Sequence, residues 1–329
     1  GNANACTGDE GLRNARAMQR ETAEQLSCDD DQVFVLSTGV IGHQLPMDKV
    51  LAGIEEAARQ LSRDGGHLAA EAIMTTDTLP KSLSAEVATP DGTIYIGGMA
   101  KGSGMIHPNM ATMLGVLTTD AKVTPELLQK LLGRSVDKSF NRISVDGDTS
   151  TNDTVLILAN GESGVSLDND PDAEAAFGAA LDAVCVDLAQ RIVRDGEGAN
   201  KFVELQITGA DSERDAHRIA ETIATSPLVK TAFAGGDANW GRILAAAGRS
   251  GVTFDPEAVT LTVGGAQHDE LVLLKEGAPT DYLEADAASI FEAEEIRVHL
   301  QIGGGPIALK YWTTDLTHAY ITINADYRT

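Results

Sequence analysis

Thr112 lies at the junction between a glycine-rich approach and an apolar run, in the stretch KGSGMIHPNMATMLGVL of residues 101–117. A threonine hydroxyl is a poor nucleophile unless a base lies next to it, and a free α-amine on the same residue is such a base. The ordinary pKa of that amine, about 7.7–8.0, lets it accept a proton near neutrality. The chain must break between Ala111 and Thr112 to release it. Glycine and proline permit a strained turn in which the hydroxyl attacks the preceding carbonyl. The same pattern also fits an ordinary loop–strand junction, where threonine is common.

Other motifs contain residue types found in nucleotide, metal or hydrolase sites, but their spacing does not match those sites. The GxGxxG start within residues 102–107 has His107 at its third glycine position and no βαβ unit around it. The loop DGDTSTND from Asp146 resembles a calcium loop, but Thr151 and Ile157 stand where glycine and glutamate are needed. The seven histidines are scattered without ligand spacing, and no GxSxG is present. We therefore expect no metal site.

Composition and charge narrow the class of protein. The chain has 329 residues and a net charge of −24, from 49 acidic and 25 basic residues. This excess of negative charge disfavours nucleic acid and anionic membranes as partners. Three widely spaced cysteines form no CxxC pair and indicate a reducing compartment without a disulfide framework. No apolar run approaches the length of a membrane span. These features predict a cytoplasmic protein of one or two lobes.

Strand-like and helical patterns alternate along the chain. A capping box at Thr7 to Glu10 predicts an N-terminal helix. Period-2 patterns and turn signals predict strands at residues 32–42, 72–77, 84–89, 93–102 and 111–119. A long Ala-rich helix is expected at about residues 173–193, and further strands and helices follow. Antiparallel-type strands with interspersed helices favour an α+β fold in which helices cover sheets.

Seven sequence blocks, from the first residue to the last, resemble the ornithine acetyltransferase (glutamate N-acetyltransferase) family of arginine biosynthesis bifunctional proteins. The blocks are GNANACTG, STGVIG, the segment MTTDTLPK, KGSGMIHPNMATML, SVDGDTSTNDT, GGDANWGRIL and INADYRT. The resemblance implies a precursor that cuts itself between Ala111 and Thr112. The freed Thr112 would take acetyl from N2-acetyl-L-ornithine and pass it to L-glutamate through an acetyl ester. No cofactor is implied, and acetyl-CoA is a possible additional donor.

The resemblance also assigns roles to individual residues. Thr38 and Gly39 would stabilise the oxyanion, as a hydroxyl and a backbone N–H aimed at developing negative charge can do. The substrate-contacting positions of the family match Thr75, Lys101, Thr112, Glu197, Asn324 and Thr329. Strand alternation would turn only one of Thr75 and Thr76 towards the site, and the sequence does not decide between them. The family-typical Asp237, Asn239 and Arg242 receive no catalytic role.

The implied fold is a layered α-β-β-α-type sandwich of the N-terminal-nucleophile kind with a second, smaller α/β lobe. Residues 1–111 would form the α-chain portion, truncated at its start relative to the family, and residues 112–329 the β-chain portion. The main lobe would comprise roughly residues 1–200 with a C-terminal strand at 318–329, and the smaller lobe residues 201–317. The family also implies an assembly of two small and two large chains.

Two alternatives remain open from the sequence. An N-terminal-threonine amidohydrolase or aminopeptidase would use the same nucleophile but let water take the acyl group, so that transfer requires a pocket that keeps water away. A truncated, inactive remnant would stay uncut.

Overall fold

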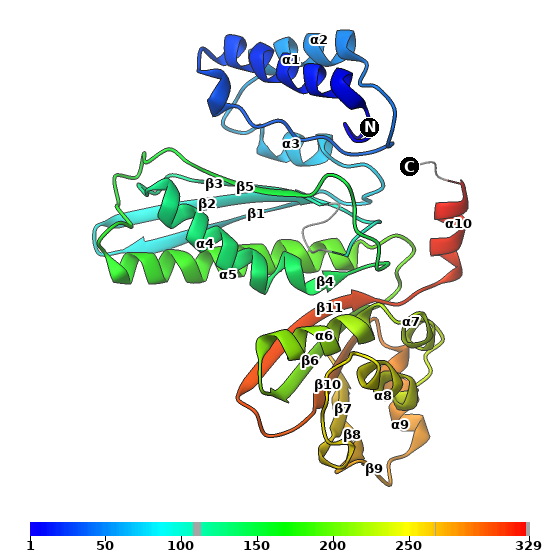
Figure 1. The fold of residues 1–329 in the computed structure, drawn as a ribbon. Helices are drawn as coiled ribbons and strands as arrows, with labels where there is room; N and C mark the ends of the chain where they lie inside the picture. Colours follow the sequence, from blue (N-terminus) through cyan, green and yellow to red (C-terminus); the bar gives the residue numbers. More distant parts are fainter. Residues whose placement is uncertain (108–112, 267, 327–329) are drawn as a thin grey trace.

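The computed structural model describes residues 1–107, 113–266 and 268–326, and shows a mixed fold of helices and two sheets (Figure 1). The helices are α1 (Gly8–Leu26), α2 (Met47–Arg59), α3 (Gly66–Ala72), α4 (Pro125–Lys138), α5 (Pro171–Arg194), α6 (Glu213–Ala224), α7 (Pro227–Ala234), α8 (Trp240–Gly248), α9 (Glu284–Glu292) and α10 (His318–Asp326), with short 3₁₀ turns η1 (Asp30–Gln32), η2 (Phe140–Arg142) and η3 (Pro256–Ala258). The strands are β1 (Lys81–Thr89), β2 (Gly92–Lys101), β3 (Leu114–Thr119), β4 (Ile143–Ser144), β5 (Thr154–Ala159), β6 (Phe202–Ala210), β7 (Thr260–Gly265), β8 (His268–Lys275), β9 (Ala278–Pro279), β10 (Glu295–Gln301) and β11 (Ile307–Thr314). The predicted α+β class with helices on sheets is confirmed.

The first sheet has the strand order β1-β2-β3-β5. β1 and β2 form an antiparallel hairpin in which Thr89 pairs with Gly92, so that Pro90 and Asp91 make the turn. β3 runs antiparallel to β2, and Lys101 pairs with Leu114. β5 joins β3 in parallel. The chain therefore returns after residue 112 directly beside the end of β2.

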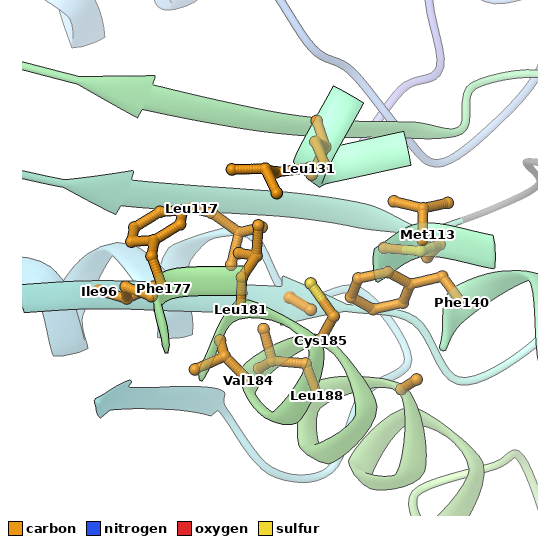
Figure 2. Packing of buried hydrophobic residues seen from close by; sticks show 14 of the residues in the cluster. Ile96, Met113, Leu117, Leu131, Phe140, Phe177, Leu181, Val184, Cys185 and Leu188 are labelled. Atoms are coloured by element: carbon orange, nitrogen blue, oxygen red, sulfur yellow. The ribbon is translucent and has the colours of Figure 1, made fainter. Parts of the chain in front are cut away.

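Helix α5 covers one face of this sheet and organises the first core. The side chain of its N-cap Asp170 accepts hydrogen bonds from the backbone N–H groups of Asp172 and Ala173, which satisfies the first turn. A stripe of buried side chains then recurs at helical spacing and points toward the sheet (Figure 2): Phe177, Leu181, Val184, Cys185 and Leu188. The same helix also contacts β11, so that a helical layer lies between the two sheets.

The second sheet has the order β4-β11-β6-β10-β7-β8-β9 and its own hydrophobic core. The first core lies within residues 87–202 and includes Trp312, whereas the second lies within residues 203–311. β11 contributes to both, because Trp312 belongs to the first core and Tyr311 to the second. The Tyr311 hydroxyl donates to the Ile143 carbonyl at 3.0 Å, which ties this strand to β4.

The strand predicted at residues 32–42 is wrong. The segment has no strand assignment beyond an isolated bridge between Asn2 and Val40, and Phe34 is 58% exposed. A period-2 pattern makes a strand only where a neighbour pairs its backbone groups, and that pairing is limited here to the single bridge. The capping box at α1 is also not formed, because Thr7 Oγ1 donates instead to Asn4 Oδ1 at 2.6 Å.

The strand predicted at residues 318–329 is also wrong, because residues 318–326 form helix α10; residues 327–329 lie outside the described structure. The alternating Ile and Thr suggested β structure, but local capping decides the conformation. Thr317 Oγ1 accepts from the backbone N–H of Ala319 at 3.1 Å and donates to the Gly198 carbonyl at 2.6 Å. These bonds start a helix and fasten it to the segment after α5.

The strand predicted at residues 72–77 is replaced by the end of α3 and a bend. Asp77 Oδ2 accepts the backbone N–H of Thr75, two residues earlier, at 3.1 Å, and this local bond curls the chain rather than extending it. Within the described parts of the chain, no helix combines the length and the apolar character that spanning a membrane requires.

Leu188→Ala should destabilise the protein by about 2–5 kcal/mol, because Leu188 is fully buried between α5 and the first sheet and its loss leaves a cavity. Leu158→Ala on β5 is the matched control, since Leu158 is 44% exposed and its loss should change stability by about 0.5 kcal/mol or less. Urea unfolding followed by circular dichroism measures both. Equal midpoints for the two variants would contradict the packing described here.

Candidate active site

A cavity of about 450 Å³ lies where the first sheet, the N-terminal segment and α10 meet. Polar side chains from segments far apart in the sequence line it. The residues singled out by sequence that line it are Thr38, Gly39, Thr75, Thr76, Lys101, Glu197 and Asn324. The fold thus brings together the predicted site residues that the structure describes, whereas Ala111, Thr112 and Thr329 lie outside the described residues.

Thr38 and Gly39 reach the cavity on a loop that the N-terminal segment holds. Gly39 has φ of +123°, and a Cβ there would lie 2.1 Å from the Gly1 carbonyl oxygen, so only glycine allows this approach. Val40 N donates to that same oxygen at 3.0 Å. Ser37 Oγ accepts from Asn4 N at 3.0 Å, which fixes the loop on its other side. The first residues of the chain therefore position the predicted oxyanion donors.

Lys101 enters the cavity from the last position of β2. Its Nζ donates to Thr75 Oγ1 at 2.9 Å and lies 3.8 Å from Asp77 Oδ2. Burial lowers the pKa of the Lys101 ammonium, and the Asp77 carboxylate opposes part of that effect. Thr75 and Thr76 both line the cavity, because the chain bends here and does not alternate as a strand would. The hydrogen bond to Lys101 distinguishes Thr75.

A buried ion-pair network supports Lys101. The Asp77 side chain is fully buried, and its Oδ1 accepts from Lys81 Nζ and Gly102 N, each at 2.7 Å. Lys81 Nζ also donates to Asp195 at the end of α5. Burial would raise the pKa of Asp77, but the Lys81 charge and the bond from Gly102 outweigh it and hold that pKa below its ordinary value. Asp77 is therefore ionised and joins three segments of the site.

Glu197 and Asn324 also line the cavity and contact each other. Asn324 Nδ2 donates to Glu197 Oε2 at 2.8 Å, and Glu197 N donates to the Ser103 carbonyl at 2.9 Å. Gly104 lies directly beneath this carboxylate: a Cβ there would be 2.3 Å from Glu197 Cδ. The second glycine of the KGSG motif thus makes room for an anionic group in the cavity.

Asp146 also lines the cavity, although the sequence motifs assigned it no role in the site. Its Oδ2 accepts from Met105 N at 2.6 Å and from the Tyr320 hydroxyl at 3.2 Å, and its Oδ1 accepts from Ile106 N at 2.9 Å. Burial raises the pKa of this carboxyl, and those donors oppose the change. The rejected calcium-loop motif therefore holds the glycine-rich segment and α10 beside the cavity.

The sequence motifs did not predict roles for Asp77 and Asp146, because the hydrogen-bond partners of an aspartate become known only from the fold. The signal that could have identified them was their place inside the motif blocks MTTDT and SVDGD.

Of the residues set aside as non-catalytic, Asn239 caps α8 through its side chain, and Arg242 donates to the Leu228 carbonyl at 2.9 Å. Over the described parts of the chain, no group of three or more His, Cys, Asp or Glu side chains is placed to hold a metal ion.

Comparison with known proteins identifies related sequences over the whole length. A model of the ArgJ family matches residues 1–329. The arginine biosynthesis bifunctional protein ArgJ of Symbiobacterium thermophilum is 50% identical over 330 aligned residues, which cover 100% of this chain and 81% of that protein. The protein of the same name from Thermotoga neapolitana is 48% identical, with 100% and 83% covered.

A solved structure shares the fold. The crystal structure of the arginine biosynthesis bifunctional protein argJ from Bacillus halodurans aligns with a TM-score of 0.60 and 40% sequence identity. The alignment covers 65% of this chain and 98% of the solved chain.

Asp77→Asn should lower the free energy of unfolding at pH 7 by roughly 3–5 kcal/mol, because a buried ion pair loses one partner. The pKa of Asp77 is lowered in the folded state, so its contribution is present above the unfolded value near 3.9 and is lost as the pH falls further. The gap between variant and wild type should therefore narrow below about pH 4.

Urea unfolding at a series of pH values from 7 to 3 tests this. Asp187→Asn is the control, since Asp187 forms a half-exposed pair with Arg191 on α5 and should change stability little. A gap that stays constant with pH would show that the Asp77 charge contributes nothing.

Proposed function

The chain belongs to the ArgJ family, whose relatives above are named arginine biosynthesis bifunctional proteins, and from this we propose that it is a self-cleaving glutamate N-acetyltransferase of arginine biosynthesis. It moves acetyl from N2-acetyl-L-ornithine to L-glutamate. Thr112, once it begins its own chain, carries the acetyl group as an ester.

The first step is the cut. The Thr112 hydroxyl attacks the Ala111 carbonyl, the peptide C–N bond breaks, and the nitrogen leaves as the Thr112 amine, so that an ester joins the two residues. Water then hydrolyses this ester and leaves a carboxylate on Ala111. The products are the two chains 1–111 and 112–329.

The second step is transfer. The Thr112 amine takes the proton of its own hydroxyl, whose oxygen attacks the acetyl carbonyl of the donor. The Thr38 hydroxyl and the Gly39 N–H stabilise the tetrahedral oxyanion, and losing one such donor reduces the rate by about a hundredfold or more. The proton passes to the leaving α-amine of ornithine. The α-amine of glutamate then attacks the ester and regenerates the threonine.

The charges of the cavity fit these substrates. Glu197 offers a carboxylate to the side-chain ammonium of ornithine, and Asn324 already bonds to that carboxylate. Lys101 pairs with a substrate carboxylate and, as a nearby cation, lowers the pKa of the Thr112 amine. Thr75 and Thr329 are the remaining proposed substrate contacts.

One observation carries the proposal: the cavity gathers the seven described residues that the sequence singled out, and the strand that follows Thr112 runs beside it, with Leu114 paired to Lys101. A second observation supports the cut. The solved relative's chain corresponds to about two thirds of this one, which is the share that residues 112–329 would make.

The word bifunctional in the relatives' names favours a second activity, and acetyl-CoA as an additional donor is the candidate to test. Hydrolysis of the acetyl ester by water is the reaction that competes with transfer.

The assembly of two small and two large chains and a cytoplasmic location remain predictions of the same proposal.

Denaturing electrophoresis of the purified protein should show two pieces, and the larger should begin Thr-Met-Leu-Gly. Thr112→Ala should stay as one 34.5 kDa band without activity, because no hydroxyl is left to attack. Thr112→Ser keeps a hydroxyl and should still cut. A fully active wild type with an intact chain would contradict the mechanism.

A product assay separates transfer from hydrolysis. With N2-acetyl-L-ornithine alone, the transferase should release ornithine only up to one equivalent per site, and turnover should need added glutamate. Steady release of acetate without glutamate would instead identify a hydrolase. Replacing the donor with acetyl-CoA in the same assay tests the second activity.

Gly104→Ala should raise the KM for N2-acetyl-L-ornithine about tenfold or more, because the new methyl displaces the Glu197 carboxylate and a charge-assisted hydrogen bond is lost. The matched control is Gly53→Ala in α2, where an added Cβ meets nothing within 4 Å. Steady-state kinetics on cut protein measures both. An unchanged KM in Gly104→Ala would remove Glu197 as the ammonium contact.

A further inference from the structure

Two aspartates of one motif hold the chain on either side of the proposed cut. Asp146 accepts the backbone N–H groups of Met105 and Ile106, which lie before the proposed cut. Asp153 accepts the backbone N–H of Met113, directly after Thr112, at 2.7 Å. Both belong to the segment DGDTSTND, which the sequence analysis had rejected as a calcium loop. The proposed mechanism has so far given Asp153 no role.

Only one of the two oxygens of the Asp153 carboxylate accepts a hydrogen bond from the described residues. Oδ1 accepts from Met113 N, whereas Oδ2 is buried and finds no hydrogen-bond partner among the described residues. A buried acceptor without a donor is costly, so such an oxygen marks a place where a donor is expected. Met113 N is covalently bonded to the carbonyl carbon of Thr112. The nitrogen of Thr112 is therefore three covalent bonds from the N–H group that this carboxylate accepts.

The groups around Asp153 indicate which hydrogen-bond donor its second carboxylate oxygen would accept. Val136, Phe140, Asn141 and Val155, from α4, η2 and β5, line a small cavity beside Asp153 and Met113 and carry no charge. The charge that acts on Asp153 is Lys101 of β2, and Lys101 itself is influenced by Asp77, Lys81 and Glu197. Burial raises the pKa of Asp153 to about 7, and the bond from Met113 and the Lys101 charge oppose this. A cationic or polar N–H group would complete the site.

We propose that Asp153 is the positioning residue of the nucleophile: Oδ1 holds the chain at Met113, and Oδ2 accepts an N–H of the amine that the cut releases on Thr112. This inference rests on the proposed function. One N–H bonded to Asp153 leaves the nitrogen lone pair to take the hydroxyl proton. The carboxylate and Lys101 act on that amine in opposite directions, because the carboxylate favours the charged form and the ammonium disfavours it.

Asp153→Asn separates the two functions of the carboxylate. The amide oxygen of Asn can still accept from Met113 N, so self-cleavage should proceed within a few-fold of the wild-type rate. The negative charge beside the amine is gone, so the amine loses its proton more easily under the influence of Lys101. The acid limb of kcat/KM for transfer should therefore move to lower pH by about one unit. A structural role alone would not move this limb.

Asp153→Ala removes both interactions and should slow self-cleavage about tenfold or more, since an amide of the cut segment loses its acceptor. Asp168→Asn is the matched control: Asp168 also accepts a backbone N–H, that of Thr124 at 2.9 Å, but this N–H lies at the start of α4 and not next to the proposed cut, so both readouts should be unchanged. Thermal unfolding of each purified variant checks that it is folded.

The rate of cutting is followed by denaturing electrophoresis, and the pH profile is measured on protein that is fully cut. A wild-type pH profile in Asp153→Asn, or wild-type cutting in Asp153→Ala, overturns the role of Asp153 while leaving the transferase intact. A wild-type protein that is active and uncut overturns the proposed function itself and the inference with it.

Discussion

The buried carboxylate of Asp77 is the interaction on which the cavity depends. It accepts the Lys81 ammonium and the Gly102 N–H through one oxygen and the Thr75 N–H through the other. A carboxylate without water is stable only when it is paired and fully hydrogen-bonded, and these three donors meet that condition. The turn after α3, the start of β1 and the end of β2 are thereby fixed to one point. The position of Lys101, the last residue of β2, depends on that junction.

The cavity lining is acidic overall, as is the whole chain, which carries a charge of −24. Among the described residues that line the cavity, Lys101 is the basic one, against the acidic Asp146, Asp148 and Glu197. A ligand with two ammonium groups or one ammonium and one carboxylate matches this pattern better than a polyanion does. The phosphates of acetyl-CoA would meet the net negative charge of this lining, which disfavours their entry into the cavity.

The sequence predicted the members of the site better than the elements that carry them. Motif residues such as Thr38, Lys101 and Asn324 were identified through their blocks, and the structure places them around one cavity. The alternating patterns at residues 32–42 and 318–326 are equally strand-like, but neither forms a strand. Whether alternation produces a strand depends on an available neighbour and on local caps such as Thr317, and both are properties of the fold. The same limit hid Asp77, whose role exists only through its partners.

The glycine-rich approach to Thr112 also takes its meaning from groups distant in sequence. Glycines alone make a chain flexible, and flexibility by itself disfavours the single conformation that an intramolecular attack needs. Here the chain before the proposed cut is fixed at Ile106 by Asp146, and the chain after it is fixed at Met113 by Asp153. Closing a short segment between two fixed ends excludes most of its conformations before any chemistry begins. Gly102 and Gly104 lie before the first fixed point, so the two aspartates, rather than the glycines, would restrict the segment that holds the proposed cut. One loop between β4 and β5 would thereby prepare the bond for cleavage from both sides.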